Sequence, residues 1–108
     1  MNKITLFIND ESVFDFDKDI TLDEGQLSFL DRMDVDMDKG IKIHGELIVA
    51  PDAEQRASFV TMNLIKALQQ DNDAVMSSSC AYLMHRFPAI NEVHVNDDEN
   101  RLKVILKE

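Results

Sequence analysis

The aspartates near the middle of the chain come nearest to a spacing that could do chemistry. Residues 34–40 read DVDMDKG, which approximates the calcium loop D-x-D-x-D-G, where carboxylates and a backbone carbonyl surround the ion. The match fails twice, because Lys39 stands where the glycine is needed and the acid expected at the twelfth position comes one residue late. A helix end with a solvated acidic face explains the same residues, and we prefer it. A weak divalent-metal site is kept as an alternative, with these ligands: Asp34, Asp36, Asp38 and Glu46.

The histidines, the cysteine and the serines do not form a catalytic or zinc-binding pattern. His44, His85 and His94 include no closely spaced pair of the kind that zinc sites use. Cys80 and His85 are five residues apart, which separates thiol and imidazole on a helix, and the serines at 77–79 lack a GxSxG elbow. We therefore expect a buried Cys80, serines that let another helix approach closely, no cofactor and no enzymatic activity.

The charge of the chain is concentrated in one third of its length. The net charge is −10, and residues 10–40 alone carry eleven acids and three bases, a net of −8. Nucleic-acid backbones and anionic membranes attract basic surfaces, so we expect neither as a partner. An acidic stretch would instead steer a basic protein partner by long-range attraction.

The length and the cysteine content bound the class of protein. A chain of 108 residues is expected to form one domain, residues 1–108, with a core that needs neither disulfide nor metal. Its single cysteine cannot form an internal disulfide, which favours a reducing compartment. The apolar run near the start is too short for a signal peptide or a membrane span. We therefore expect a cytoplasmic protein.

Alternating apolar residues predict strands at both ends of the chain. Residues 3–9 and 13–17 read as one hairpin, and the runs on either side of the polar turn at 96–100 read as a second. Residues 41–49 also alternate, but Gly45 interrupts them, so we expect a short strand or an extended connector with a bend.

A first helix is predicted from about Glu24 to Asp38, with Thr21 or Asp23 as its N-cap and Gly40 as its stop. Like charges at spacings of three and four repel by a few tenths of a kcal/mol each. Packing must therefore stabilise this helix against its own acidic face, which we place on the outside. The residues of this face are Asp31, Asp34 and Asp38.

Residues 51–88 predict two further helices and form the most apolar part of the chain. Asp52 caps the first of them and Asp73 the second, which ends before Pro88. Both helices carry more apolar residues than one stripe needs, either because helix one and the sheet cover them or because they form an interface. The interface candidates are Phe59, Met62, Ile65, Met76, Tyr82 and Met84.

The order of elements is thus β-β-α-(β)-α-α-β-β. It predicts an α+β fold in which N-terminal and C-terminal hairpins form an antiparallel sheet packed against two to three central helices. The preferred functional hypothesis is a non-catalytic protein that binds another protein, with a basic protein as the candidate partner, or that forms a homodimer. The alternatives are an acidic inhibitor or nucleic-acid mimic that occupies a basic protein, and a weak metal-binding protein or enzyme using the aspartate cluster.

Overall fold

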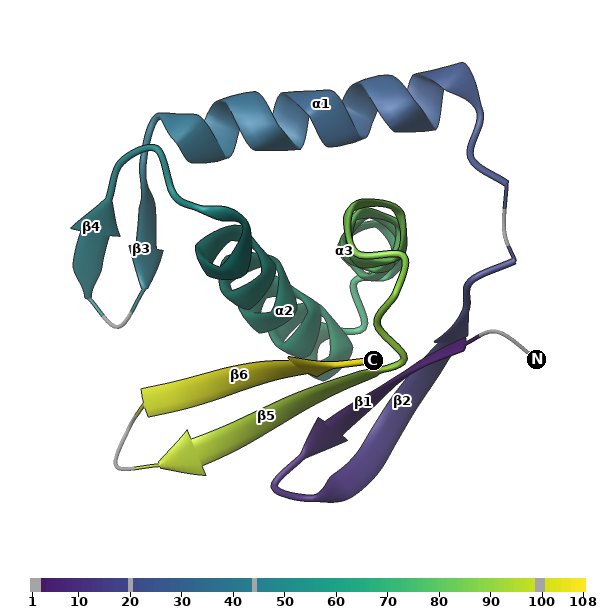
Figure 1. The fold of residues 1–108 in the computed structure, drawn as a ribbon, viewed down its shortest axis with the longest axis vertical. Coiled ribbons are helices and arrows are strands. Elements are labelled where there is room, and N and C mark those ends of the chain that lie inside the picture. Colours follow the sequence, from purple (N-terminus) through teal and green to yellow (C-terminus); the bar gives the residue numbers. More distant parts are fainter. Residues whose placement is uncertain (1–2, 20, 44, 99–100) are drawn as a thin grey trace. The chain divides into compact units, whose positions relative to one another are not determined.

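A computed structural model describes the backbone of residues 3–19, 21–43, 45–98 and 101–108, and their side chains except at positions 97, 98, 101 and 102. The described residues contain three α-helices and six β-strands, in the order that the sequence predicts (Figure 1). The α+β class is therefore confirmed. None of the described helices is long and apolar enough to cross a membrane.

The chain divides into two compact units. The first, the sheet unit, comprises Met1–Thr21 and Leu83–Glu108, and the second, the helical unit, comprises Leu22–Tyr82. The boundary lies within the last helix, α3 (Asp73–Arg86), which contributes residues to both. The expected single domain stays a prediction, and each unit is described in turn.

The sheet unit contains a four-stranded sheet in the order β2-β1-β5-β6. Its strands are β1 (Lys3–Ile8), β2 (Glu11–Asp17), β5 (Glu92–Asp98) and β6 (Arg101–Lys107). Pairing is antiparallel within each hairpin, as predicted, but β1 and β5 are parallel. The sheet is therefore mixed rather than antiparallel throughout. Parallel neighbours need a long crossover, and the helices between β2 and β5 supply it.

One face of this sheet is buried and holds the apolar residues of the two inner strands. Ile4 and Leu6 of β1 and Val93 and Val95 of β5 are each at most 1% exposed. Alternation along each strand places these side chains on one face and leaves a mixed face on the other, which includes Lys3, Glu92 and the stacked rings of Phe7 and His94. The period-2 pattern of the sequence therefore predicted the correct buried face.

Two local features fix the hairpin of β1 and β2. Asn9 and Asp10 both have positive φ angles, 51° and 68°, which is the backbone of a two-residue turn between twisted strands. At the other end, Lys18 Nζ donates hydrogen bonds to the carbonyl oxygens of Pro88 (2.7 Å) and Ile90 (2.9 Å). This lysine ties the end of β2 to the segment that precedes β5.

Capping boxes begin two helices of the helical unit, α1 (Glu24–Asp38) and α2 (Ala53–Gln70). Asp23 and Asp52 each accept the backbone N–H of a glutamine three residues later, at 2.8 Å. The glutamine side chain accepts the N–H of the aspartate in return, so two N–H groups without partners in the helix are satisfied. The predicted start and end of α1 are confirmed.

The N-cap of α3 differs from the prediction by one residue. Asn72 is the cap, because its side-chain oxygen accepts the N–H of Val75 at 3.3 Å and its carbonyl accepts the N–H of Met76. Asp73 is the first residue of the helix. The preceding Asp71 has a positive φ of 53°, which turns the chain sharply between α2 and α3 and moves the cap to Asn72.

Residues 41–48 form a separate small hairpin rather than one strand or a connector. Its strands are β3 (Ile41–Ile43) and β4 (Glu46–Ile48), paired antiparallel. Gly45, where we expected a bend, has a φ of 80° and lies in the turn. The reversal is complete because glycine adopts this backbone without the steric cost of a Cβ.

Candidate functional site

Arg56, in the first turns of α2, is the centre of the most elaborate polar cluster in the helical unit. Its Nε donates to the carbonyl oxygen of Pro51 at 3.0 Å. Its Nη1 donates to the backbone carbonyl (3.1 Å) and to Oδ1 (3.2 Å) of Asp34, and its Nη2 donates to Asp38. Since the Arg56 side chain is only 18% exposed, this arginine needs these partners to be stable in its position.

The electrostatics of Arg56 follow from these contacts. Burial disfavours the charged guanidinium, but the hydrogen bond and charge of Asp38, together with the charge of Asp34, outweigh it and raise the pKa of Arg56. The arginine is therefore a fixed cation that holds the C-terminal half of α1 against the start of α2. An arginine suits this task because its planar fork of donors can bind two carboxylates at once.

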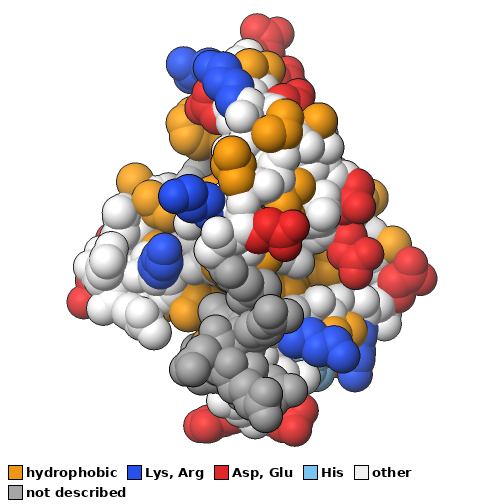
Figure 2. Space-filling model, turned by 90° about the vertical axis from the view of Figure 1, so that its left-hand side faces the viewer, with side chains coloured by type: hydrophobic (Ala, Val, Ile, Leu, Met, Phe, Trp, Pro, Cys, Tyr) orange, Lys and Arg blue, Asp and Glu red, His pale blue; other side chains and the backbone are white. Residues whose placement is uncertain are grey.

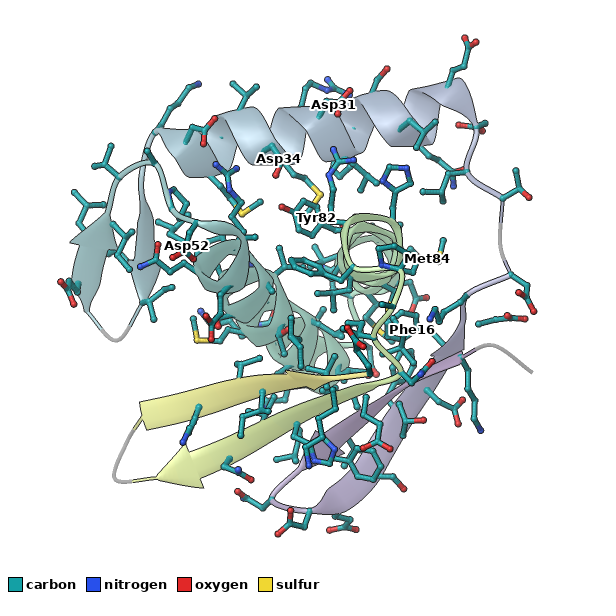
Figure 3. The ribbon with its side chains drawn as sticks, in the orientation of Figure 1. Phe16, Asp31, Asp34, Asp52, Tyr82 and Met84 are labelled. Carbon is teal, nitrogen blue, oxygen red and sulfur yellow. The ribbon has the colours of Figure 1, made fainter. Side chains whose placement is uncertain are left out.

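Asp34 also binds a residue of α3. The hydroxyl of Tyr82 donates to Oδ1 of Asp34 at 2.6 Å, and Figure 3 shows these two side chains pointing toward one another from α1 and α3. Tyr82 is 2% exposed, and this bond gives its buried hydroxyl a charged acceptor. One carboxylate thus joins three helices, through Arg56 on α2 and Tyr82 on α3.

The structure changes the predicted outward acidic face of α1 at one position. Asp31 and Asp38 are exposed, as expected, although Asp38 also pairs with Arg56, whereas Asp34 is half-buried and points to Arg56. A signal for Asp34 was present in the sequence, because it follows Leu30 by four residues and precedes Met37 by three. Leu30 and Met37 are buried, so this spacing places Asp34 on the buried side.

The four candidate metal ligands do not converge. Asp34 and Asp38 are ion-paired with Arg56, whereas Asp36 is exposed beside Lys39. The three aspartates lie in helix α1 and not in a loop, and Glu46 begins β4. In the described part of the chain, no group of three or more His, Cys, Asp or Glu side chains could hold a metal ion. His44, a possible contributor, lies outside the described residues.

A groove of about 410 Å³ lies between the first half of α1 and the first half of α3. The residues of α3 that line the groove are small and lie at helical spacing, so they leave the groove open on that side. The side chains of α1 that line it are larger and include an aromatic ring. The lining residues that matter most are Gly25, Phe29 and Leu30 of α1, and Ala74, Ser77 and Ala81 of α3.

The groove has an apolar floor and a charged rim. Leu30 is buried at its base, and Phe29 beside it is 44% exposed, which is high for a phenylalanine. Arg32 lies over the Phe29 ring, 5.7 Å from its centre. Asp23 lines the same groove, and the exposed Asp73 directly precedes its α3 side. Ser77 and Ser78 line the groove, and Ser77 is exposed, so the expected close approach of another helix at the serines stays a prediction.

The remaining nominal reactive groups are separated and have other partners. Burial raises the pKa of the Cys80 thiol to about 12, so it is protonated at neutral pH and is a poor nucleophile. His85 is exposed and its Nδ1 lies 2.9 Å from Arg86. In the sheet unit, His94 stacks on Phe7 and its Nε2 lies 2.7 Å from Glu92.

The interface candidates are less exposed than their number suggested. Tyr82 and Met84 are buried, at 2% and 9% exposure, and the other four are half-buried: Phe59, Met62, Ile65 and Met76. The most exposed apolar residues of the helical unit were not among them, namely Phe29, Val35, Leu47 and Val49. Figure 2 shows the apolar side chains of one face as separate patches among acidic and basic ones. An interface through the six candidates stays a prediction.

Sequence reasoning missed Arg56 and the groove for different reasons. Arg56 borders the apolar run of α2 as a lone cation, which was a usable signal for a buried ion pair. The groove needs α1 and α3 to face each other, which their sequences do not encode. Comparison with known proteins gives no further guidance, since no family model, no curated protein and no solved structure matches the chain.

Proposed function

We propose that the protein is a non-catalytic binding module whose α1–α3 groove takes an amphipathic segment of a basic partner protein. The observation that carries this proposal is the groove itself, where a half-exposed Phe29 lies beside buried Leu30, and charged Asp23 and Arg32 also line the groove. An amphipathic helix that lays its apolar face into such a groove is a common mode of peptide recognition. The small side chains on the α3 side of the groove leave room for the apolar side chains of such a helix.

Charge supports a basic partner over an acidic one. Residues 22–82 contain eleven acids and five bases, a net of −6, and Arg56 is already ion-paired. A field of this sign accelerates the encounter with a cationic segment, and salt weakens the effect. Arg32 and Asp23 are the charged residues that line the groove, so the negative sign of the field comes from the helical unit as a whole and not from the groove lining.

Two observations favour binding over catalysis. The titratable groups that the fold brings together, Arg56 with Asp34 and Asp38, bind one another. The Cys80 thiol is protonated at neutral pH by its burial. A protein whose one cysteine is kept as a thiol also suits a reducing compartment, and we include a cytoplasmic location in the proposal.

Two synthetic peptides of equal length test the groove. The first is an amphipathic helix of leucine and lysine, and the second replaces each lysine with glutamate. NMR titration of the full chain should move the amide signals of Gly25, Phe29 and Ser77 with the lysine peptide only. Added salt should weaken the binding.

Variants distinguish binding in the groove from binding by charge attraction alone. Phe29→Ala and Ser77→Leu should weaken binding of the lysine peptide about tenfold, because the first removes the aromatic contact and the second fills the groove. Val35→Ala is the matched control, since Val35 is equally apolar and exposed on α1 but does not line the groove. Equal binding by all three variants, or shifts confined to other residues, would contradict the proposal.

A further inference from the structure

The two edge strands of the four-stranded sheet carry opposite charges on the same face. In the described residues, β2 and β6 each pair on one side only, with β1 and β5 respectively. The pairing registers place Asp15 and Asp17 of β2 on the face that holds Lys103 and Lys107 of β6. The opposite face carries apolar residues on both edges, including Phe14 and Phe16 on β2 and Val104 and Leu106 on β6.

The hydrogen bonds inside the sheet determine which backbone groups point outward from β2. Thr5 N–H donates to the Asn91 carbonyl at 3.0 Å, and Asn9 N–H donates to the Val95 carbonyl at 2.8 Å. Alternate residues of β1 therefore bond to β5, and the residues between them bond to Phe14 and Phe16 of β2. The backbone groups of Asp15 and Asp17 are left pointing away from the sheet.

The same reasoning applies to β6. Since the carbonyl of Val95 faces β1, the neighbouring residues His94 and Asn96 of β5 bond to β6. Their partners there, Ile105 and Lys103, are occupied. The backbone groups of Val104 and Leu106 therefore point to the open edge.

We infer that these two edges pair with each other between copies of the chain, β6 of one copy against β2 of the next. In the sheet order, β2 and β6 point in the same direction, because each is antiparallel to a neighbour and those neighbours are parallel. A repeat of the sheet side by side therefore makes a parallel junction. In a parallel pair, a residue whose backbone groups face the other strand bonds to two residues there. Its N–H donates to the carbonyl of the residue before the one beside it, and its carbonyl accepts from the N–H of the residue after that one.

One register satisfies both the backbone and the side chains. With Asp15 beside Ile105 of the next copy, the N–H of Asp15 faces the Val104 carbonyl and the carbonyl of Asp15 faces the Leu106 N–H. Asp17 is then beside Lys107, and Asp15 lies diagonally between Lys103 and Lys107. On the other face, Phe14 meets Val104 and Phe16 meets Leu106. Opposite charges and apolar pairs at these positions each stabilise a junction.

Charge also excludes the symmetric alternatives. A junction of β6 with β6 brings lysines together, and a junction of β2 with β2 brings aspartates together, which is destabilising. The remaining junction is head-to-tail, and such interfaces give rings or open chains of subunits. Two features keep the junction short and weak. The bulge in β2, opposite Leu6 and Phe7 of β1, limits the length of regular strand at the edge. The net charge of −10 makes copies of the chain repel one another.

Charge reversal in the full chain tests the inference by sedimentation velocity at low salt. The wild type should form species heavier than the monomer as concentration rises, and high salt should dissociate them. Asp15→Lys with Asp17→Lys should abolish these species, because both edges are then basic. Lys103→Glu with Lys107→Glu should abolish them too, because both edges are then acidic.

Mixing the two variants provides the decisive measurement. The basic β2 of one variant then meets the acidic β6 of the other, and the unaltered edges also match, so mixed species should form at the wild-type concentration. Circular dichroism and thermal unfolding establish that each variant is folded, and recovery on mixing itself requires folded chains. A monomeric wild type at all concentrations, self-association of either variant alone, or no recovery on mixing would overturn the inference.

Discussion

The hydroxyl of Tyr82 donates a 2.6 Å hydrogen bond to Asp34, a residue 48 positions earlier in the chain. The same carboxylate oxygen accepts from Arg56 at 3.2 Å. A tyrosine hydroxyl, a guanidinium and a carboxylate thus satisfy one another where α1, α2 and α3 meet. The helical unit depends on this contact as well as on its apolar core.

The bond between Asp34 and Tyr82 should be worth more than an exposed hydrogen bond. Asp34→Asn should lower the free energy of unfolding by about 2 kcal/mol. The substitution weakens the hydrogen-bond acceptor for Tyr82 and removes the negative charge that pairs with Arg56. Urea unfolding measures the loss. Asp36→Asn is the matched control, since the Asp36 side chain is 77% exposed and its pair with Lys39 should contribute about 0.5 kcal/mol or less. A double-mutant cycle with Tyr82→Phe should show coupling, and strictly additive losses would contradict the bond.

Lysine should not replace Arg56. Arg56→Lys keeps the charge but offers one point donor in place of the fork that binds Pro51, Asp34 and Asp38, so we expect a loss of about 2 kcal/mol. Arg56→Ala should cost about 3 kcal/mol, since it also leaves Asp34 half-buried without its cation. Because the folded pKa of Arg56 is raised above its unfolded value, this contribution to stability is complete below the unfolded pKa and is lost only as the pH rises through the folded one. If Arg56→Lys has the same free energy of unfolding as the wild type, the positive charge alone, without the fork of donors, is sufficient to stabilise the cluster.

The cap of α3 can be located by a pair of substitutions. Asn72→Ala should lower the free energy of unfolding by about 1 kcal/mol, because it removes the acceptor for the Val75 N–H. Asp73→Asn, which changes only the charge near the helix N-terminus, should cost about 0.3 kcal/mol. Thermal unfolding distinguishes the two, and a larger loss at position 73 would return the cap to Asp73.

The Cys80 thiol should react slowly with thiol reagents in the folded protein. Burial raises its pKa from 9.0 to about 12, so almost no thiolate forms at neutral pH, and reaction with an aromatic disulfide reagent should accelerate when urea unfolds the chain. A Cys80→Ser chain that also carries Ser77→Cys is the control, because position 77 is exposed and its thiol should react at once. The folded pKa lies above the unfolded one, so the contribution of Cys80 to stability is complete below pH 9.0 and is lost as the pH rises toward about 12. Fast reaction of native Cys80 at neutral pH would contradict its burial.

Thr61 of α2 offers a stabilising substitution. It is fully buried, and its Oγ1 has no hydrogen-bond partner among the described residues. Thr61→Val replaces this hydroxyl with a methyl group of nearly the same size, so we expect the free energy of unfolding to rise by about 1 kcal/mol. Thr61→Ala, which removes the hydroxyl but leaves a cavity, should not share the gain. A loss of stability in the valine variant would show that the hydroxyl has a partner.

Features that depend on neighbouring residues could be predicted from the sequence alone. Alternation identified the strands β1 and β2, Asp52 was correctly expected to cap α2, and Asp23 was one of two candidates for the cap of α1. These succeed because a strand or a helix cap is decided within a few residues by backbone geometry and local hydrogen bonds. The order of elements, and with it the α+β class, followed directly.

The partners of the α1 aspartates and the pairing between the two hairpins depend on contacts that form only in the folded chain. Asp34 was expected on a solvated face, but Arg56 and Tyr82, both distant in sequence, lie beside it in the folded chain. The parallel pairing of β1 with β5 depends on the path of the whole chain between them. Both depend on contacts between residues that are far apart in the sequence, where local propensity carries no information and packing of complete elements selects the partner.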